Sequence, residues 1–244
     1  MTTYKHPLTA TTALDSGVIA RLASRSYYRT SPQVQELLLL SKNEQTFSGI
    51  LSRELTEKPT LQLDGSSHPN AGLVLLELKG KDYLKRNANG VEKATRNFHD
   101  VSIVNSDAEI EVIIENKVWY HFDGAKGAVK AKPEPGIARQ IKADIEKIKQ
   151  TLDGSQSLRR GFILLNIVTP GNPSLIPASY RKEHEKVWDR CIHSAPLYRE
   201  EGLNGIRKVL GNFDADLRAI EIEGFTNSES GGYIDFICAE VKLD

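Results

Sequence analysis

The sequence predicts an α/β fold in which a mixed central β-sheet is flanked by helices. Three patterns carry this prediction: apolar β-branched segments within 98–122, a nearly all-apolar segment at 161–169, and an amphipathic segment at 137–152. The first is typical of strands joined in a hairpin, the second of a strand at the buried centre of a sheet, and the third of a helix packed on one. Because helices and strands interleave along the chain, we expect one layered core.

Composition describes an ordinary globular chain, and its 244 residues suffice for one large domain or two small ones. No segment approaches the roughly 18–20 apolar residues of a membrane span, so no membrane partner is expected. The 32 basic and 32 acidic residues balance, which argues against a general nucleic-acid coat protein but allows a local basic cleft. Only Cys191 and Cys238 are cysteines, which fits a reduced, cytoplasmic protein, with one disulfide bridge left open as the alternative. The N-terminus lacks a signal-peptide pattern.

Helices are predicted in the first quarter of the chain. Segment 17–29 spaces its arginines along one side of a helix, either as a solvated face or as a phosphate-binding face. Ser31-Pro32 has the chemistry of a helix start. A further helix over 42–57 follows a capping-box pattern in which Glu44 is the acid. Glu44 therefore has a structural explanation as a cap and a functional one as an acid aimed into a site.

Two Glu-x-Lys motifs follow, each after a spaced aspartate. Strand 73–80 carries Glu77 and Lys79, preceded by Asp64. The sequence after Asp64 is turn-rich and cannot continue as a strand, so this motif fits the outward face of an edge strand better. The later motif combines Asp100, which leads into an alternating strand, with Glu115-Asn116-Lys117.

The later motif lies in a predicted hairpin. Asp100 opens its first strand, Asn105-Ser106-Asp107 supplies the turn, and the second strand runs from Glu109 to the Glu-Asn-Lys motif. The two-residue period of a strand puts Glu115 and Lys117 on one face. Charged groups at the ends of apolar strands are costly unless they are paired or hold a metal. Two carboxylates around one hard cation, with a lysine beside them, would explain this arrangement.

A lysine-rich loop and a helix are predicted after the hairpin. Segment 123–136 is rich in Gly, Pro and Lys, and its Lys126, Lys130 and Lys132 fit either a solvated loop or contacts with a phosphate backbone. Helix 137–152 carries Gln140 beside its apolar stripe. A strand at 161–169, a helix at 197–210 and a hairpin of strands 217–225 and 233–243 complete the prediction. That hairpin either covers the sheet or forms its other edge.

The chain is predicted to form one domain with three segments. These are an N-terminal segment 1–30, a core 31–170, and a C-terminal helical and β-hairpin extension 171–244 that packs on the core. The extension contains His184, Cys191 and His193, whose spacing matches no standard zinc motif. The chain contains no phosphate-binding Gly-rich loop, nucleotide fingerprint or Gly-x-Ser-x-Gly elbow.

Residues 40–168 resemble the PD-(D/E)XK nuclease superfamily. The resemblance is carried by Asn43-Glu44, by Phe98-His99-Asp100 and its strand, by Ile113-Ile114-Glu115-Asn116-Lys117, and by Gln140 on the next helix. His99 stands where the motif often has Pro, and the tyrosine that usually follows the glutamine is absent, with Asp144 and Ile145 in its neighbourhood.

This resemblance implies a restriction-endonuclease-like core and a Mg²⁺-dependent deoxyribonuclease. Asp100 and Glu115 would hold Mg²⁺, or Mn²⁺ in its place, with Glu44 reaching the metal directly or through water. The metal would lower the pKa of a bound water and neutralise transition-state charge. Lys117 would orient that water or stabilise the developing anion, and Gln140 would position the lysine or contact phosphate.

Other functions remain open at the level of sequence. A restriction-type endonuclease, in which symmetric cutting would suggest a homodimer, stands beside a repair or recombination exonuclease. A non-catalytic DNA-binding or regulatory protein with a nuclease-like fold is a different class. In a third hypothesis the acids are solvated strand ends in an interaction protein.

Overall fold

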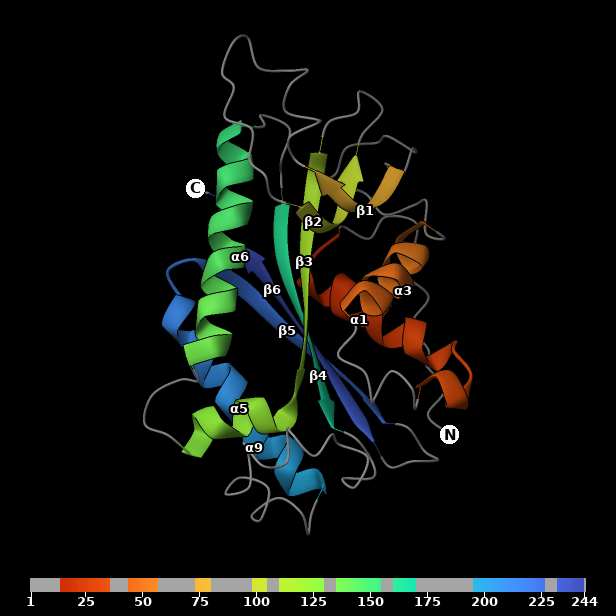
Figure 1. Cartoon of the computed structure of the whole chain (residues 1–244), viewed down its shortest axis with the longest axis vertical. Coiled ribbons are helices and arrows are strands. Elements are labelled where there is room, and N and C mark those ends of the chain that lie inside the picture. Colours follow the sequence, from red (N-terminus) through yellow and green to blue (C-terminus); the bar gives the residue numbers. More distant parts are fainter. Residues whose placement is uncertain are drawn as a thin grey trace.

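The described part of the chain forms one six-stranded mixed sheet with helices on both faces (Figure 1). The computed structural model describes residues 14–35, 44–56, 73–79, 98–104, 110–129, 135–154, 160–169, 195–226 and 232–243. The strand order is β1-β2-β3-β4-β6-β5. The strands are β1 (Leu73–Lys79), β2 (Phe98–Val104), β3 (Ile110–Tyr120), β4 (Arg160–Thr169), β5 (Leu217–Thr226) and β6 (Tyr233–Val241).

One parallel pair, β3 with β4, lies in the middle of the sheet, and the other neighbouring strands pair antiparallel. Parallel strands need a crossover, which α5 (His121–Val129) and α6 (Pro135–Gly154) supply. The predicted hairpin is confirmed by the pairing of β2 with β3, and its turn lies outside the described residues. The predicted edge position of 73–80 is confirmed by β1.

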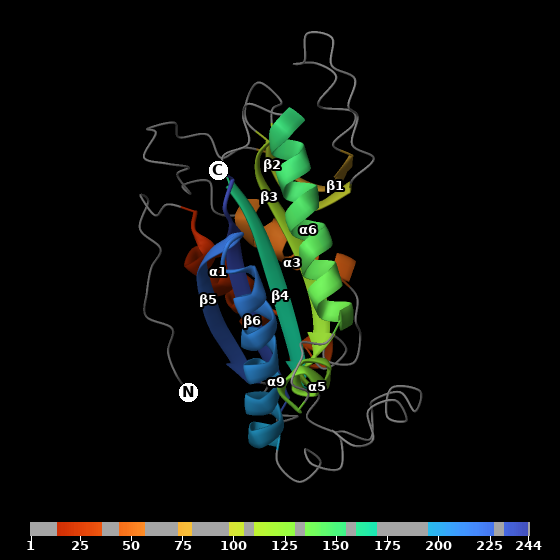
Figure 2. The same cartoon turned by 90° about the vertical axis from the view of Figure 1, so that its left-hand side faces the viewer.

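Two helical layers bury the two faces of the sheet (Figures 1 and 2). α1 (Ser16–Tyr28) and α3 (Glu44–Thr56) cover one face, whereas α6 and α9 (Ala195–Leu210) cover the other, with α5 packed against α9. A short 3₁₀ helix, η2 (Gly211–Phe213), follows α9. Alternate residues of β3 serve the two cores: Ile114 packs on the α1 and α3 side, and Ile113 on the α6 and α9 side.

The apolar stripe of the predicted helix 137–152 is buried in α6. Ile137, Ile141, Ile145 and Ile148 are at most 3% exposed. Burying side chains of this kind stabilises the fold by about 1.5–3 kcal/mol each relative to solvent exposure, as an upper estimate. α6 is therefore fixed rigidly over the sheet, and its polar residues next to the stripe are held at the sheet surface.

The C-terminal hairpin is part of the central sheet rather than a cover on it. β6 pairs with β4, and β5 pairs with β6 to form the edge opposite β1. Of the two predicted placements, the other edge of the sheet is therefore confirmed.

The predicted loop over 123–136 is wrong for its first part, because His121–Val129 is helical and follows β3 directly. Its composition suggested a loop, but α5 is stabilised by close packing on α9. A Cβ atom added at Gly124 would lie 2.4 Å from the backbone oxygen of Gly202 on α9. Here the glycine is required for helix contact rather than for chain reversal.

None of the helices in the described residues is long and apolar enough to cross a membrane.

Candidate active site

The site forms where β2 and β3 cease to pair with each other. In the described part of the two strands, their backbone pairing ends at Val101 opposite Ile114. Beyond that pair the Asp100 carboxylate takes the place of a backbone acceptor, and Asn116 N–H donates to its Oδ2 atom at 2.7 Å. The separation lets side chains from the helical layers on both faces of the sheet reach the same point.

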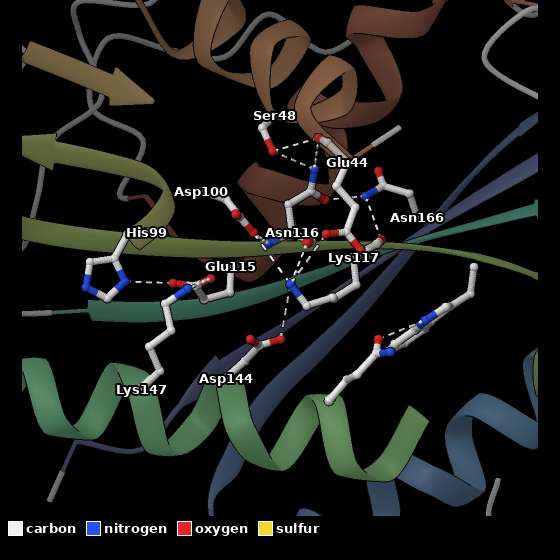
Figure 3. Close-up of polar contacts among 12 residues, drawn as sticks. Glu44, Ser48, His99, Asp100, Glu115, Asn116, Lys117, Asp144, Lys147 and Asn166 are labelled. Atoms are coloured by element: carbon white, nitrogen blue, oxygen red, sulfur yellow. Dashed lines mark hydrogen bonds and ion pairs between the residues drawn. The ribbon is translucent and has the colours of Figure 1, made fainter. Parts of the chain in front are cut away.

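Three carboxylates surround the Lys117 ammonium at this point (Figure 3). Nζ of Lys117 lies 3.8 Å from Glu44 Oε2, 3.6 Å from Asp100 Oδ2 and 3.5 Å from Asp144 Oδ2. Glu44 comes from the first turn of α3, Asp100 from β2 and Asp144 from α6. The ammonium also donates to the Asn116 carbonyl at 3.0 Å. One cationic group therefore joins three elements that are distant in sequence.

The side chain of Asn116, on the opposite face of β3 from Lys117, links β3 to α3 and β4. Its side-chain Nδ2 donates to the Glu44 carbonyl at 3.3 Å and to Ser48 Oγ at 3.0 Å. Asn166 of β4 donates to Asn116 Oδ1 and, at 3.0 Å, to the Lys117 carbonyl. The bonds to Ser48 and between the two asparagines are buried, and the other two are partly buried. Satisfied polar networks of this kind rigidify their surroundings. These bonds fix the first turn of α3, and so the position of Glu44, relative to β3.

Glu115 is fully buried and both of its oxygens are occupied. Oε1 accepts from His99 Nδ1 at 2.7 Å, and Oε2 accepts from Lys147 Nζ at 2.5 Å. His99 Nε2 lies 2.9 Å from Thr151 Oγ1 on α6. Burial acts to raise the pKa of Glu115, but the hydrogen bond from His99 and the charge of Lys147 outweigh it and lower that pKa. Glu115 is thus held ionised and oriented.

The other three acids have the opposite behaviour. Burial, together with the repulsion of neighbouring carboxylates, raises the pKa of Glu44 and of Asp100 despite the nearby charge of Lys117. Burial raises the pKa of Asp144 to about 7, against an ordinary value of 3.8. For Lys117, burial acts to lower the pKa, but the charges of Asp144, Asp100 and Glu44 outweigh it and raise it. The cluster contains more negative charge than its cations neutralise.

Four predicted site residues are brought together: Glu44, Asp100, Glu115 and Lys117. As expected from strand period, Glu115 and Lys117 both face α6, with contacts to Lys147 and Asp144 respectively. Gln140 has a different environment: it is exposed and accepts a hydrogen bond from Trp119 Nε1 at 3.2 Å.

Several residues that the sequence singled out cannot be placed. Lys126 belongs to α5 but its side chain is not described, and Lys130 and Lys132 lie outside the described residues. The same holds for the alternative motif, because Asp64 is outside the described residues and the side chains of Glu77 and Lys79 are not described. The zinc candidates, which are His184, Cys191 and His193, also lie outside.

Sequence reasoning missed the roles of Asp144, Lys147 and Asn166. Asp144 and Lys147 are adjacent to the apolar stripe of α6 and look like the solvated face of any amphipathic helix. Asn166 carried a usable signal, because it is the one polar side chain between Phe162 and Val168 in an otherwise apolar strand. Such a residue has to find a buried partner.

The donor chemistry of this cluster suits a hard divalent cation, since carboxylate oxygens are the preferred ligands of Mg²⁺ and Ca²⁺. Within the described residues, however, no three Asp, Glu, His or Cys side chains lie close enough to hold an ion as they stand. The ammonium of Lys117 separates the carboxylates. Cation binding therefore requires the side chains to rearrange.

Comparisons of the chain with protein-family models, with curated proteins and with solved structures find no match. Function is therefore inferred from the chemistry of the site and from the motif that it contains.

Proposed function

We propose that this protein is a Mg²⁺-dependent nuclease that hydrolyses DNA phosphodiester bonds, with a core of the PD-(D/E)XK type. The observation that carries the proposal is the convergence of Glu44, Asp100 and Lys117, with Glu115 adjacent, where β2 separates from β3. These are the residues of the motif, and they come from three elements. DNA as the substrate class follows from the resemblance of the motif, and a cytoplasmic location is part of the same proposal.

Each residue has a role that follows from its environment. Asp100 and Glu115 would hold the metal, with Glu44 as a further ligand on its exposed side. The occupied oxygens of Glu115 do not prevent this, because an ionised carboxylate has about four acceptor positions. When bound, the metal supplies Lewis-acid activation of water and neutralisation of charge at phosphorus.

Lys117 and His99 act beside the metal ligands. Lys117, whose side chain is 14% exposed, lies beside these acids, and its ammonium would stabilise negative charge that develops on a phosphate oxygen. His99 orients Glu115 through the 2.7 Å hydrogen bond, as outer groups commonly orient metal-binding carboxylates.

A second candidate, a non-catalytic DNA-binding or regulatory protein with the same core, is favoured by one observation. Glu115 is 0% exposed and engaged at both oxygens, as a purely structural ion pair would be.

The test is cleavage of supercoiled plasmid and of linear single- and double-stranded DNA with Mg²⁺, Mn²⁺ or EDTA, alongside Lys117→Ala. We expect cleavage that EDTA abolishes and that the variant reduces by about 10²–10³-fold or more, since that is the scale of losing one charge-stabilising group. Lys142→Ala, which removes an exposed lysine of α6, is the matched control and should retain activity.

The pattern of products separates the alternatives. Discrete fragments indicate a site-specific endonuclease, and shortening from the ends indicates an exonuclease. Cleavage by folded Lys117→Ala at the wild-type rate would contradict the assignment, and DNA binding without cleavage under every condition would favour the non-catalytic candidate.

A further inference from the structure

The cluster around Lys117 contains two more carboxylates than ammonium groups. Its acids are Glu44, Asp100, Glu115 and Asp144, and its lysines are Lys117 and Lys147. Lys147 is committed to Glu115 at 2.5 Å, which leaves Lys117 alone to neutralise the remaining three acids. Each of its three contacts is 3.5 Å or longer, beyond the range of a good charge-assisted hydrogen bond. The excess equals the charge of one divalent cation.

Asp144 supplies the second observation. Its side chain is only 9% exposed, and its Oδ2 atom has no hydrogen-bond partner among the described residues. A buried carboxylate oxygen without a donor is costly, so it needs an explanation such as a missing ion. Figure 3 shows Asp144 projecting from α6 toward the ammonium of Lys117, into the centre of the cluster.

We propose that Asp144 is a further ligand of the divalent cation assigned above to Asp100, Glu115 and Glu44, and that the Lys117 ammonium occupies the cation's position in the metal-free protein. The proposal deepens the nuclease function proposed above, and its cation-binding part stands without it. It adds a ligand from α6, an element to which the sequence assigned only Gln140, and it makes Lys117 a residue that moves aside when metal binds.

The distances are compatible with such an exchange. Mg²⁺–oxygen and Ca²⁺–oxygen distances are about 2.0–2.1 and 2.3–2.6 Å, so each carboxylate would close in by roughly 1–2 Å from its present distance to the nitrogen. Glu44, with a side chain 41% exposed in the first turn of α3, has room to move. Asp144 is fixed on a rigid helix, which makes it a preorganised ligand.

The experiment is calorimetric titration of the full-length protein with Mn²⁺ alone and with Mg²⁺ alone, at pH 8 and without DNA. Four proteins are compared: wild type, Asp144→Asn, Lys117→Met and Glu146→Gln. Glu146 is the matched control, because it lies on the same helix but is 56% exposed and pairs only with Lys142 among the described contacts. Thermal unfolding verifies that each variant is folded.

We expect Asp144→Asn to weaken cation binding roughly tenfold or more, because ligand charge count sets affinity at such sites. Lys117→Met should strengthen it roughly tenfold, because a competing positive charge is removed. Glu146→Gln should bind like wild type.

Three outcomes would overturn the proposal: wild-type affinity in folded Asp144→Asn, unchanged or weaker binding in Lys117→Met, and no binding by either wild type or Lys117→Met. These outcomes are separable from failure of the nuclease function. Cation binding as expected without DNA cleavage would contradict the nuclease alone, and EDTA-sensitive cleavage with undisturbed binding in Asp144→Asn would contradict this inference alone.

Discussion

Two charged clusters flank the C-terminal half of β3, and they differ in how completely their polar atoms are paired. The first, around Lys117, has three acids with raised pKa values. One of its buried carboxylate oxygens, Asp144 Oδ2, accepts no hydrogen bond among the described residues. The second begins at His121, directly after the strand, and joins His121 to Thr169, Asp235 and Arg199. The second cluster is the more deeply buried one, since the side chains of His121 and Asp235 are 0% exposed whereas those of Glu44 and Asp100 are 41% and 26% exposed, so burial alone does not explain the difference.

The second cluster has a partner for each charged or polar atom that it buries. His121 Nε2 donates to Asp235 Oδ2 at 2.8 Å, Thr169 contacts the other ring nitrogen, and Arg199 binds both oxygens of Asp235. Burial acts to raise the pKa of Asp235, but the hydrogen bonds from Arg199 and His121 outweigh it and lower that pKa. Burial lowers the pKa of His121 and keeps its imidazole neutral.

The comparison teaches which cluster serves stability and which is available for chemistry. A fully paired network stabilises the folded state and gains nothing from a ligand. Carboxylates with raised pKa values destabilise the folded state when they are ionised. A bound cation would reduce this destabilisation. Strongly raised carboxylate pKa values, as in the cluster around Lys117, are typical of functional sites.

The largest expected effect comes from breaking the satisfied cluster. Asp235→Ala removes the shared acceptor of His121 and Arg199, and we expect it to lower the free energy of unfolding by about 3–5 kcal/mol. Asp216→Ala is the control, because Asp216 also pairs with a basic residue, Lys149, at 2.7 Å but is 39% exposed; its loss should cost under about 1 kcal/mol. Urea unfolding measures both, and equal losses would contradict the comparison.

A smaller effect is expected from disturbing the helix contact next to His121. A Cβ atom at Gly202 would lie 2.6 Å from the His121 carbonyl oxygen, so Gly202→Ala should destabilise the protein by about 1–3 kcal/mol. At Gly211 a Cβ atom would meet nothing within 4 Å, which makes Gly211→Ala the matched control. Thermal unfolding distinguishes them; an unchanged melting temperature in Gly202→Ala would show that α5 and α9 can separate freely.

The smallest effect, and the one of opposite sign, concerns Asp144. Its pKa is raised from 3.8 in the unfolded chain to about 7 in the folded protein, so the folded state binds a proton more tightly. Stability therefore falls as pH rises from about 4 to 7, and the full cost persists above 7. Asp144→Asn removes this cost. A pKa change of this size corresponds to at most about 4 kcal/mol, and relaxation of the site and entry of water reduce it, so we expect the variant to be more stable than wild type by about 1–2 kcal/mol at pH 8.

Unfolding of metal-free protein at pH 4 and pH 8 measures this effect. The gain should disappear at pH 4, where Asp144 is protonated in the folded protein. A variant that is less stable than wild type at pH 8 would show that Asp144 is a paired residue that stabilises the fold, as Asp235 is expected to be.

The fold was predictable wherever a hydrophobic period was strong. The isoleucine stripe of α6, the apolar strand β4 and the alternation in β2 and β3 each specify a buried surface, and these elements are confirmed. α5 was not predictable, because its Gly- and Lys-rich sequence has no helical period and its stability comes from packing on α9.

The site was predictable only in part, for a related reason. Glu44, Asp100, Glu115 and Lys117 belong to one motif, which can be recognised from their order and spacing in the sequence. Asp144 and Lys147 act through their position on a helix that is itself placed by apolar packing, so their proximity to Lys117 and Glu115 is a property of the tertiary structure. Asp235, although polar in an apolar strand, could not be paired with His121 from sequence across 114 positions.

The most direct test of the central claim, that the under-neutralised cluster is a metal-dependent nuclease site, is the cleavage rate of plasmid DNA by Asp100→Asn in Mg²⁺, measured with its unfolding midpoint. The account predicts a folded protein, as stable as wild type or more so, whose cleavage is reduced by at least about 10²-fold. An Asp100→Asn variant that cleaves DNA at the wild-type rate would contradict it.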